Sequence, residues 1–178
     1  YYYYVSHLVG KIATVLDEKE DAAHYFEIAE QARSDLNAYY FNKDENRYWT
    51  SKQGADVFPL SFDMVPTEKR ESVLASLIEH LQTINMHFDA GILATPLLLE
   101  LLTDEGREDI AFMLMNQRDF PSFGDYIINQ GATTLWEYFD GSNSHSHPMY
   151  GSVCRWFFKA LAGINPDENS PGMQHFVI

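Results

Sequence analysis

The segment Ile92-Leu93-Ala94-Thr95-Pro96-Leu97-Leu98-Leu99-Glu100-Leu101-Leu102 is apolar at almost every position. A helix at the surface of a globular protein carries one apolar stripe, whereas a helix that is apolar around most of its circumference is buried. The segment therefore predicts a helix that is enclosed by other elements of the fold.

On both sides of this segment, apolar residues recur at spacings of three and four, which is the period of an amphipathic helix. The pattern predicts further helices over residues 3–16, 20–41, 55–64, 67–82, 107–117 and 151–162. Pro59 is expected to bend or restart the third of these. Short polar connections such as Asp17–Glu20 join the first helices, so we expect consecutive helices to run antiparallel as hairpins.

The first two helices have apolar stripes that we expect to face inward. In the first helix the stripe comprises Val5, Leu8, Val9, Ile12, Val15 and Leu16. In the second helix it comprises Ala22, Tyr25, Phe26, Ala29, Ala32, Leu36 and Tyr40.

Helical hairpins with almost no strand signal predict an all-α protein. Three architectures satisfy this pattern: a helical bundle, an α-solenoid, or part of an α/α toroid in which hairpins form a ring. No repeat of fixed period is visible, which disfavours a regular solenoid. Residues 42–49 are expected to form a polar loop, residues 165–171 a linker, and residues 175–178 the start of a strand.

Size and charge limit the classes of function. The 178 residues suffice for one domain or part of one. The net charge of −14 disfavours nucleic acid and anionic membranes as partners but is compatible with a neutral ligand. No segment approaches the ~20 consecutive apolar residues that cross a bilayer.

Neither a metal nor a cofactor is expected. His145 and His147 stand two positions apart but lack carboxylate or thiol companions at ligand spacing. The lone Cys154 lies in the apolar run Val153–Phe158 and is expected to be a buried thiol.

One carboxylate lies in an unusual setting. The run Gly131-Ala132-Thr133-Thr134-Leu135-Trp136-Glu137, followed by Ser144–Gly151, surrounds Glu137 with Trp, Tyr, Phe and His residues. Aromatic faces can stack on sugar rings, and histidines can exchange hydrogen bonds with sugar hydroxyls. This composition is typical of a sugar pocket, although a Trp-Glu pair is more often part of an interface than catalytic.

A specific resemblance supports the sugar hypothesis. The blocks Gln130–Glu137, His145–Val153, Trp156-Phe157 and Leu161–Ile164 resemble the C-terminal part of the six-hairpin α/α-barrel domain of bacterial α-L-rhamnosidases of glycoside hydrolase family 78. Upstream segments that resemble the same domain are Ala22–Tyr25, Ala29-Glu30, Gly91–Leu98 and Asp119–Gly124.

The resemblance implies an all-α fold in which antiparallel helical hairpins form roughly half of an (α/α)6 toroid. It implies that residues 1–164 are the second half of a glycosidase catalytic domain, and that residues 165–178 are a linker and the start of a C-terminal β segment. The implied reaction is inverting hydrolysis of terminal α-L-rhamnose from glycosides or polysaccharides, carried out by a longer enzyme, with a rhamnoside as the partner.

The resemblance also assigns roles to individual residues. Glu137 matches the general base that activates the attacking water. Trp136 would help to wall the rhamnose subsite, with a plain core role as the rival interpretation. His147 matches a sugar-contacting histidine, and His87 matches a loop histidine near the pocket. His145 is matched less well, and a structural role is favoured there.

The general acid of this family lies in an Asp/Trp/Glu-rich loop that has no counterpart in these 178 residues. An inverting glycosidase needs two carboxyl groups about 6.5–9.5 Å apart. Asp89, Asp125 and Asp140 are the local candidates for the second carboxyl group, but none stands in the family's acid motif, and loop or capping roles are favoured. The chain alone is therefore expected to be inactive.

Two alternatives remain at this point. The chain could belong to another (α/α)6-toroid carbohydrate-active enzyme, or it could be a non-catalytic helical scaffold. Part of a toroid would expose an apolar inner surface, so self-association is also expected. The cellular compartment is left open.

Overall fold

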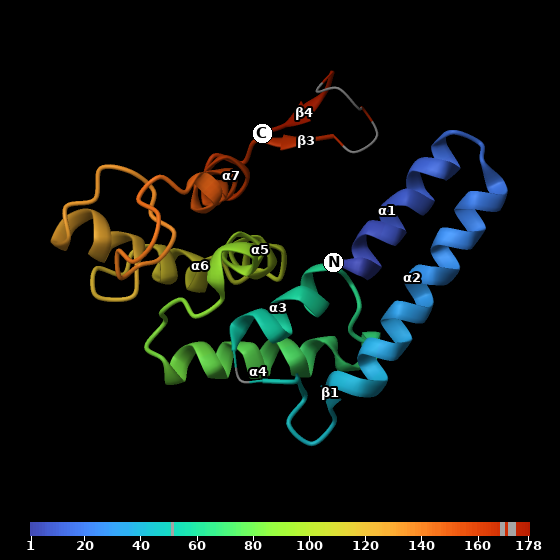
Figure 1. Ribbon diagram of the computed structural model, residues 1–178, viewed down its shortest axis with the longest axis horizontal. Coiled ribbons are helices and arrows are strands. Elements are labelled where there is room, and N and C mark those ends of the chain that lie inside the picture. The colour runs from blue at the N-terminus through green and yellow to red at the C-terminus, as the bar shows by residue number, and fades with distance from the viewer. Residues whose placement is uncertain (51, 168–169, 171–173) are drawn as a thin grey trace.

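The computed structural model describes residues 1–50, 52–167, 170 and 174–178. Figure 1 shows an almost entirely helical molecule in which the α1–α2 hairpin projects to one side. The helices are α1 (Tyr2–Val15), α2 (Lys19–Tyr40), α3 (Gln53–Ser61), α4 (Arg70–Thr83), α5 (Gly91–Asp104), α6 (Glu108–Met115) and α7 (Cys154–Trp156). The 3-10 turns cover Thr67–Lys69 and Pro148–Val153, and π-helical turns cover Asp125–Asn129 and Phe157–Leu161.

Consecutive helices contact one another, as helical hairpins require. α3 packs against α4 and α5, and α5 also packs against α6, the Pro148–Val153 turn and α7. Trp156 Nε1 donates a hydrogen bond to Thr103 Oγ1 at 2.8 Å, which joins the C-terminal parts of α7 and α5. The N-terminal ends of α3, α5 and the Pro148–Val153 turn therefore lie at one end of the molecule. This arrangement confirms the prediction of hairpins forming part of an α/α toroid.

The core is centred on α5. Its buried residues are Ala94, Thr95, Leu98, Leu99, Leu101 and Leu102. They pack with buried side chains of α4 and α6, among them Leu77, Leu81, Ile110 and Leu114. Burying one leucine side chain contributes about 2 kcal/mol, so this helix supplies a large part of the apolar stabilisation. The buried helix predicted from Ile92–Leu102 is confirmed.

The predicted inward stripe of α1 is wrong. Val5, Ile12 and Val15 are exposed, and the buried face of α1 is made of small residues. Gly10 explains the difference: a Cβ there would stand 2.8 Å from the Phe26 ring of α2, so α1 and α2 meet through a close approach that only small residues allow. In α2, Ala22 and Ala29 of the expected stripe are buried, but Tyr40 is exposed.

An ionic cluster closes the end of the molecule opposite the N-terminal ends of α3 and α5. The Arg70 guanidinium binds Asp63 Oδ1 at 3.0 Å and Glu105 Oε1 at 2.6 Å, and it also donates to the Leu60 carbonyl at 3.0 Å. This one side chain therefore links α4 to the C-terminal ends of α3 and α5.

The C-terminal part of the chain differs from the expectation in two ways. The predicted helix over 151–162 is a succession of 3-10, α and π turns. Cys154 is exposed, so the prediction of a buried thiol is wrong. Val153 and Trp156 are the buried residues of this segment. Since successive helical residues point about 100° apart, Cys154 faces away from the side on which Val153 packs.

Short strands appear where loops were expected. β1 (Phe41–Asn42) pairs antiparallel with β2 (Arg47–Tyr48) inside the predicted polar loop. β3 (Asn165–Pro166), in the predicted linker, pairs with β4 (Phe176–Val177), where a strand was predicted. Residues 168, 169 and 171 of that linker lie outside the described residues.

Asp56 is a buried acid in the first turn of α3 and accepts the Tyr48 N–H at 2.7 Å. Burial raises the pKa of Asp56 from 3.8 to about 6, although the hydrogen bond from Tyr48 and the charge of Arg47 oppose the shift. The folded state therefore binds more protons than the unfolded state between about pH 4 and pH 6. In that window, this group lowers the free energy of unfolding as the pH rises.

We expect Asp56→Asn to remove this dependence, because asparagine keeps an oxygen for the Tyr48 N–H but cannot ionise. The stability of the variant relative to the wild type should rise by up to about 3 kcal/mol from pH 4 to pH 7. Urea unfolding followed by tryptophan fluorescence measures this difference, with Asp44→Asn at an exposed turn as control. A difference between variant and wild type that stays constant with pH would contradict the assignment.

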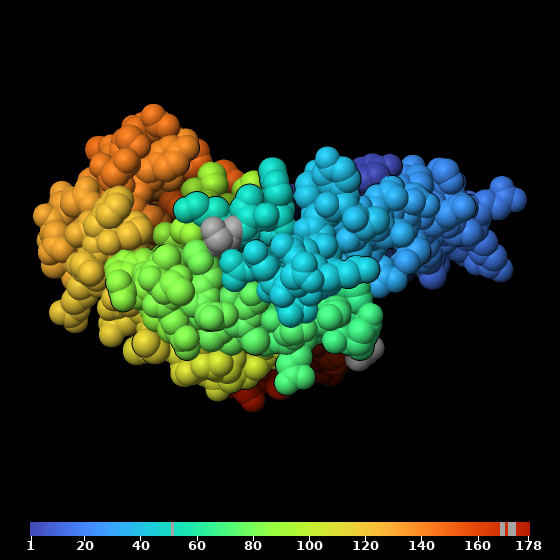
Figure 2. Space-filling view, turned by 90° about the horizontal axis from the view of Figure 1, so that it is seen from below, coloured from blue at the N-terminus to red at the C-terminus, as the bar shows by residue number. Residues whose placement is uncertain are grey.

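A wide groove separates the α1–α2 hairpin from α3. It has a volume of ≈ 1290 Å³, and its lining includes Tyr1, Tyr40, Trp49, Phe58 and Phe62. Figure 2 shows the hairpin (blue) extending away from the remainder of the molecule. Among the described residues, no helix combines the length and apolarity that spanning a membrane requires.

Candidate functional site

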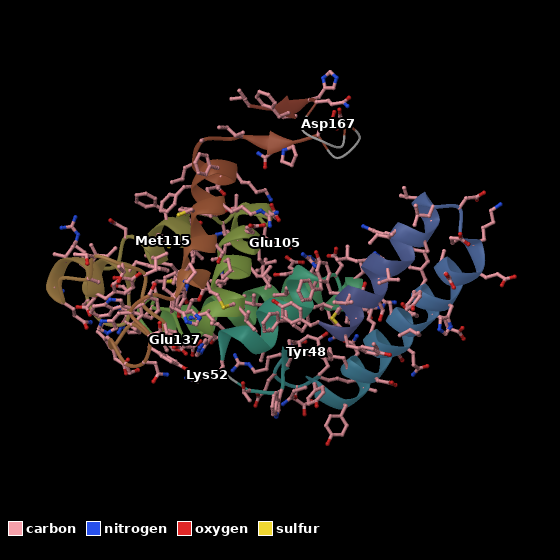
Figure 3. The ribbon with its side chains drawn as sticks, turned by 45° about the horizontal axis from the view of Figure 1, so that its top comes forward. Tyr48, Lys52, Glu105, Met115, Glu137 and Asp167 are labelled. Atoms are coloured by element: carbon pink, nitrogen blue, oxygen red, sulfur yellow. The ribbon has the colours of Figure 1, made fainter. Side chains whose placement is uncertain are left out.

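Three loops meet at the N-terminal ends of α3 and α5: the one that contains residues 49, 50 and 52, residues 84–90, and the long segment 116–147. The fully buried Gln53 joins the first two, since its Nε2 donates to the His87 carbonyl at 2.7 Å and its Oε1 accepts the Asp89 N–H at 3.1 Å. In Figure 3, Glu137 and Lys52 lie toward the same side of the molecule, away from Glu105 at the other end. The long loop therefore carries Glu137 to this end of the helices.

Glu137 is held by a hairpin-like loop. Its N–H donates to the Ser144 carbonyl at 2.9 Å, and the Ser144 N–H donates back to Glu137 Oε2 at 3.3 Å. A second link joins the His147 N–H to the Leu135 carbonyl at 2.8 Å. The Glu137 side chain remains 25% exposed, and its Oε1 has no hydrogen bond within the described part of the chain. One oxygen is thus used for positioning while the other is free.

Buried aromatic residues on both sides of Glu137 anchor the loop. Trp136 and Phe139 are each only 9% exposed. They belong to a cluster of aromatic rings in mutual contact with Phe88, Phe123, Tyr126 and Tyr150. Burial raises the pKa of the Tyr150 hydroxyl to about 12, so this cluster is apolar and uncharged around neutrality. The alternation of buried and half-exposed residues directs the Glu137 carboxylate toward the surface.

Trp136 is enclosed by the protein. Its indole stacks on the Tyr126 ring at 5.4 Å and on the His145 ring at 4.3 Å between centroids. Gly141 also lies against it, since a Cβ at Gly141 would stand 2.9 Å from the indole. The structure therefore places Trp136 in the core beneath Glu137. His145 also donates from Nε2 to the Gly141 carbonyl at 2.7 Å, which joins it to its own loop rather than to Glu137.

His147 is the histidine that faces Glu137. Its Nδ1 lies 3.7 Å from Glu137 Oε2. Its Nε2 is buried and has no hydrogen-bond partner among the described residues. His145 and His147 have different neighbours because separate backbone hydrogen bonds hold the loop on either side of them. The Ser144 carbonyl binds the Glu137 N–H, and the His147 N–H binds the Leu135 carbonyl. Among the predicted site residues in the described part of the chain, only Glu137 and His147 contact each other through charged or polar atoms.

His87 is occupied by other partners. Its Nδ1 faces the Ile84 carbonyl at 3.1 Å, and its Nε2 faces Asp119 Oδ1 at 3.1 Å. The side chain thus connects the 84–90 loop to the beginning of the long loop. Both nitrogens are engaged, so this conformation leaves none for a ligand.

The three candidate second carboxylates are engaged as well. Asp89 binds the Gln53 N–H with Oδ1 and binds His80 and Lys52 with Oδ2. Asp140 binds the N–H and hydroxyl of Ser142, which lower the pKa of its carboxyl group.

Asp125, the third candidate, binds the side-chain amides of Asn129 and Gln130, which lower its pKa. A general acid must carry a proton, and the donors bound to Asp125 and Asp140 instead stabilise the ionised form of these two carboxylates. All three carboxylates bind donors of the loops or of neighbouring segments, which is what a loop or capping role requires.

Sequence reasoning missed two contributors. Gln53 lies two residues before the predicted helix 55–64 and is a buried amide at the start of α3. Ser144 acts through its backbone, so neither residue has a sequence signal of its own. The structure also offers no group of three or more His, Cys, Asp and Glu residues fit to hold a metal within the described ranges.

Comparison with known proteins identifies the family. Residues 1–161 match the model of the bacterial alpha-L-rhamnosidase six-hairpin glycosidase domain. An α-L-rhamnosidase of Streptomyces avermitilis is 34% identical over 177 residues, which cover 93% of this chain and 17% of that protein. An α-L-rhamnosidase of Alteromonas sp. is 32% identical over 183 residues, which cover 96% of this chain and 20% of that protein. The chain thus spans about a fifth of the length of these relatives.

Solved structures agree with the sequence comparison. The α-L-rhamnosidase of Dictyoglumus thermophilum superposes with a TM-score of 0.86 at 35% identity, over 92% of this chain and 19% of that one. The Streptomyces avermitilis enzyme in complex with L-rhamnose superposes with a TM-score of 0.85 at 33% identity, over 93% of this chain and 17% of that one. The chain therefore belongs to the family of bacterial α-L-rhamnosidase six-hairpin glycosidase domains.

Proposed function

We propose that the protein containing this chain hydrolyses terminal α-L-rhamnose from glycosides or polysaccharides, with inversion at the anomeric carbon and Glu137 as the general base. The carboxylate of Glu137 carries this proposal. One of its oxygens is held by the Ser144 N–H, and the other is free at a partly exposed position. A base that removes a proton from water needs this combination of fixed position and open access.

We propose that His147 contributes to the same site. It lies beside Glu137, and its Nε2 has no partner in the described structure. The His147 side chain is 27% exposed, so a sugar hydroxyl could contact its accessible atoms, although Nε2 itself is buried. His87 could contact the substrate only if its bond to Asp119 opened. Trp136 and His145, which stack on each other, would act by stabilising the loop that carries Glu137.

The general acid is proposed to come from a part of the protein outside these 178 residues. Asp125 and Asp140 are engaged by donors that favour their ionised form, and both oxygens of Asp89 are engaged by Gln53, His80 and Lys52, so none of the three is free to protonate a leaving oxygen. The chain alone is therefore expected to show no rhamnoside cleavage above background.

A substrate panel tests the proposed function. In the full-length protein that contains this chain, aryl α-L-rhamnosides should be cleaved, and aryl glucosides and mannosides should not. Proton NMR of the first sugar released should show the β-anomer, as inversion requires. Cleavage of a different glycoside would favour another (α/α)6-toroid enzyme, and no cleavage of any glycoside would favour the scaffold.

We also expect the isolated chain to self-associate. α1 exposes Val5, Ile12 and Val15, and the adjacent groove is largely apolar. Contiguous exposed apolar surface of this kind favours association. Size-exclusion chromatography with light scattering should show a mass that rises with concentration, and Ile12→Lys should reduce it. A monomer at all concentrations that binds no hydrophobic dye would contradict this expectation.

A further inference from the structure

Asp125 is a buried carboxylate that the proposed reaction does not use directly. It begins the π-helical turn Asp125–Asn129 and is 9% exposed. Its Oδ1 accepts the Asn129 side-chain amide at 2.9 Å, and its Oδ2 accepts the Gln130 side-chain amide at 2.6 Å. These donors lower the pKa of the Asp125 carboxyl group, so it is ionised around neutrality.

Gln130 passes this contact on to the loop that carries Glu137. The same amide nitrogen that binds Asp125 also donates to the Phe139 carbonyl at 3.0 Å. A primary amide has two hydrogens, so both bonds can form at once. Together they close the segment from Gln130 to Phe139 into a loop, with Glu137 two residues from its closing point.

Asn129 performs the corresponding task on the other side of Asp125. Its amide nitrogen donates to the Arg118 carbonyl at 2.9 Å as well as to Asp125 Oδ1. The Asp125 carboxylate therefore orients two amides. The Asn129 amide binds the segment that precedes Asp125, and the Gln130 amide binds the segment that contains Glu137. Both amide residues are exposed, so water could replace these bonds at little cost in stability. Water molecules in place of these bonds would not, however, hold the loop that carries Glu137 in one fixed position.

We propose that Asp125 is a positioning residue for the hydrolysis: through the Gln130 amide and the Phe139 carbonyl, it holds the loop that places Glu137. This inference rests on the proposed role of Glu137 as general base. A displacement of about 1 Å in a reacting group can lower a rate about 100-fold. The effect is therefore expected in kcat rather than in substrate binding or in stability.

A double-mutant cycle in the full-length enzyme tests the proposal. Asp125→Asn and Gln130→Leu should each lower kcat by about 10- to 100-fold, with KM and melting temperature close to those of the wild type. The double variant should be no slower than the slower single variant, because both changes break the same link. Asp109→Asn, the same exchange on an exposed residue of α6, should leave kcat unchanged.

An unchanged kcat in both single variants would overturn the proposal, and so would additive losses in the double variant. A fall in melting temperature that parallels the loss of activity would assign Asp125 a structural role only. Should Asp125→Asn fail to fold, Gln130→Leu still decides the question, since it alters an exposed side chain.

Hydrogen exchange in the chain itself gives a readout that is independent of activity. The Glu137 N–H is bonded to the Ser144 carbonyl, and exchange of this amide reports how often the loop opens. Asp125→Asn should accelerate it by about tenfold relative to Asp109→Asn, the change expected when the opening free energy falls by one hydrogen bond. An unaltered exchange rate refutes the positioning role. If exchange accelerates but Glu137→Gln leaves the enzyme active, the proposed function fails instead.

Discussion

Glu137→Gln is expected to lower kcat for rhamnoside hydrolysis about 10²- to 10⁴-fold, the range that a positioned general base contributes. Glutamine keeps an oxygen that can accept the Ser144 N–H, so the loop and the melting temperature should change little. The amide cannot take a proton from water, and this loss is chemical rather than structural.

The measurement is steady-state hydrolysis of an aryl α-L-rhamnoside by the full-length protein. Glu79→Gln, on an exposed position of α4, is the matched control and should leave kcat unchanged. An unchanged kcat in Glu137→Gln would show that Glu137 is not the general base and that its loop has a structural role only.

Gly124→Ala is expected to cause a large loss of stability. A Cβ at Gly124 would stand 2.2 Å from the backbone oxygen of Gln117 and 3.2 Å from the Arg118 Cα. These are backbone atoms and cannot rotate away as a side chain could. We therefore expect the variant to lose about 3 kcal/mol, the upper part of the range for overpacking, with the 117–124 loop displaced.

Urea unfolding of the chain checks this expectation against Gly54→Ala in α3. At Gly54 a Cβ would meet the Ala90 carbonyl at 3.5 Å, an ordinary contact. Since alanine is favoured over glycine in a helix by up to about 1 kcal/mol, this control should be neutral or stabilising. Equal stabilities for the two variants would mean that the 117–124 loop shifts to accommodate the added Cβ without a loss of stability.

The buried surface of a helix was predictable from the sequence where its apolar residues cover nearly the whole circumference. The Ile92–Leu102 segment is apolar nearly all around, so it had to be enclosed whatever its rotation. α1 offered a choice. Its larger apolar residues suggested one face, but Ser6, Gly10 and Ala13 pack against α2 because the two helices approach too closely for larger side chains. The contact surface of a helix depends on its partner, which periodicity does not reveal.

The candidate site shows the same division. The block from Gln130 to Val153 was sufficient to indicate the family, and it identified Glu137 as the carboxylate of interest. It could not distinguish the roles of His145 and His147, which differ by two positions. One stacks on Trp136 and the other faces Glu137, because separate backbone bonds hold their segments.

By itself, the amino-acid sequence determined the helical hairpins, the family and the residue types around Glu137, because these follow from local periodicity and from a contiguous motif. Only the tertiary structure decided which carboxylates are engaged. Asp89 is held by Gln53, 36 positions away, and Asp125 by amides that also reach Arg118 and Phe139. Hydrogen bonds that join segments far apart in the sequence set the position of these groups, so their contacts emerge only when the chain has folded.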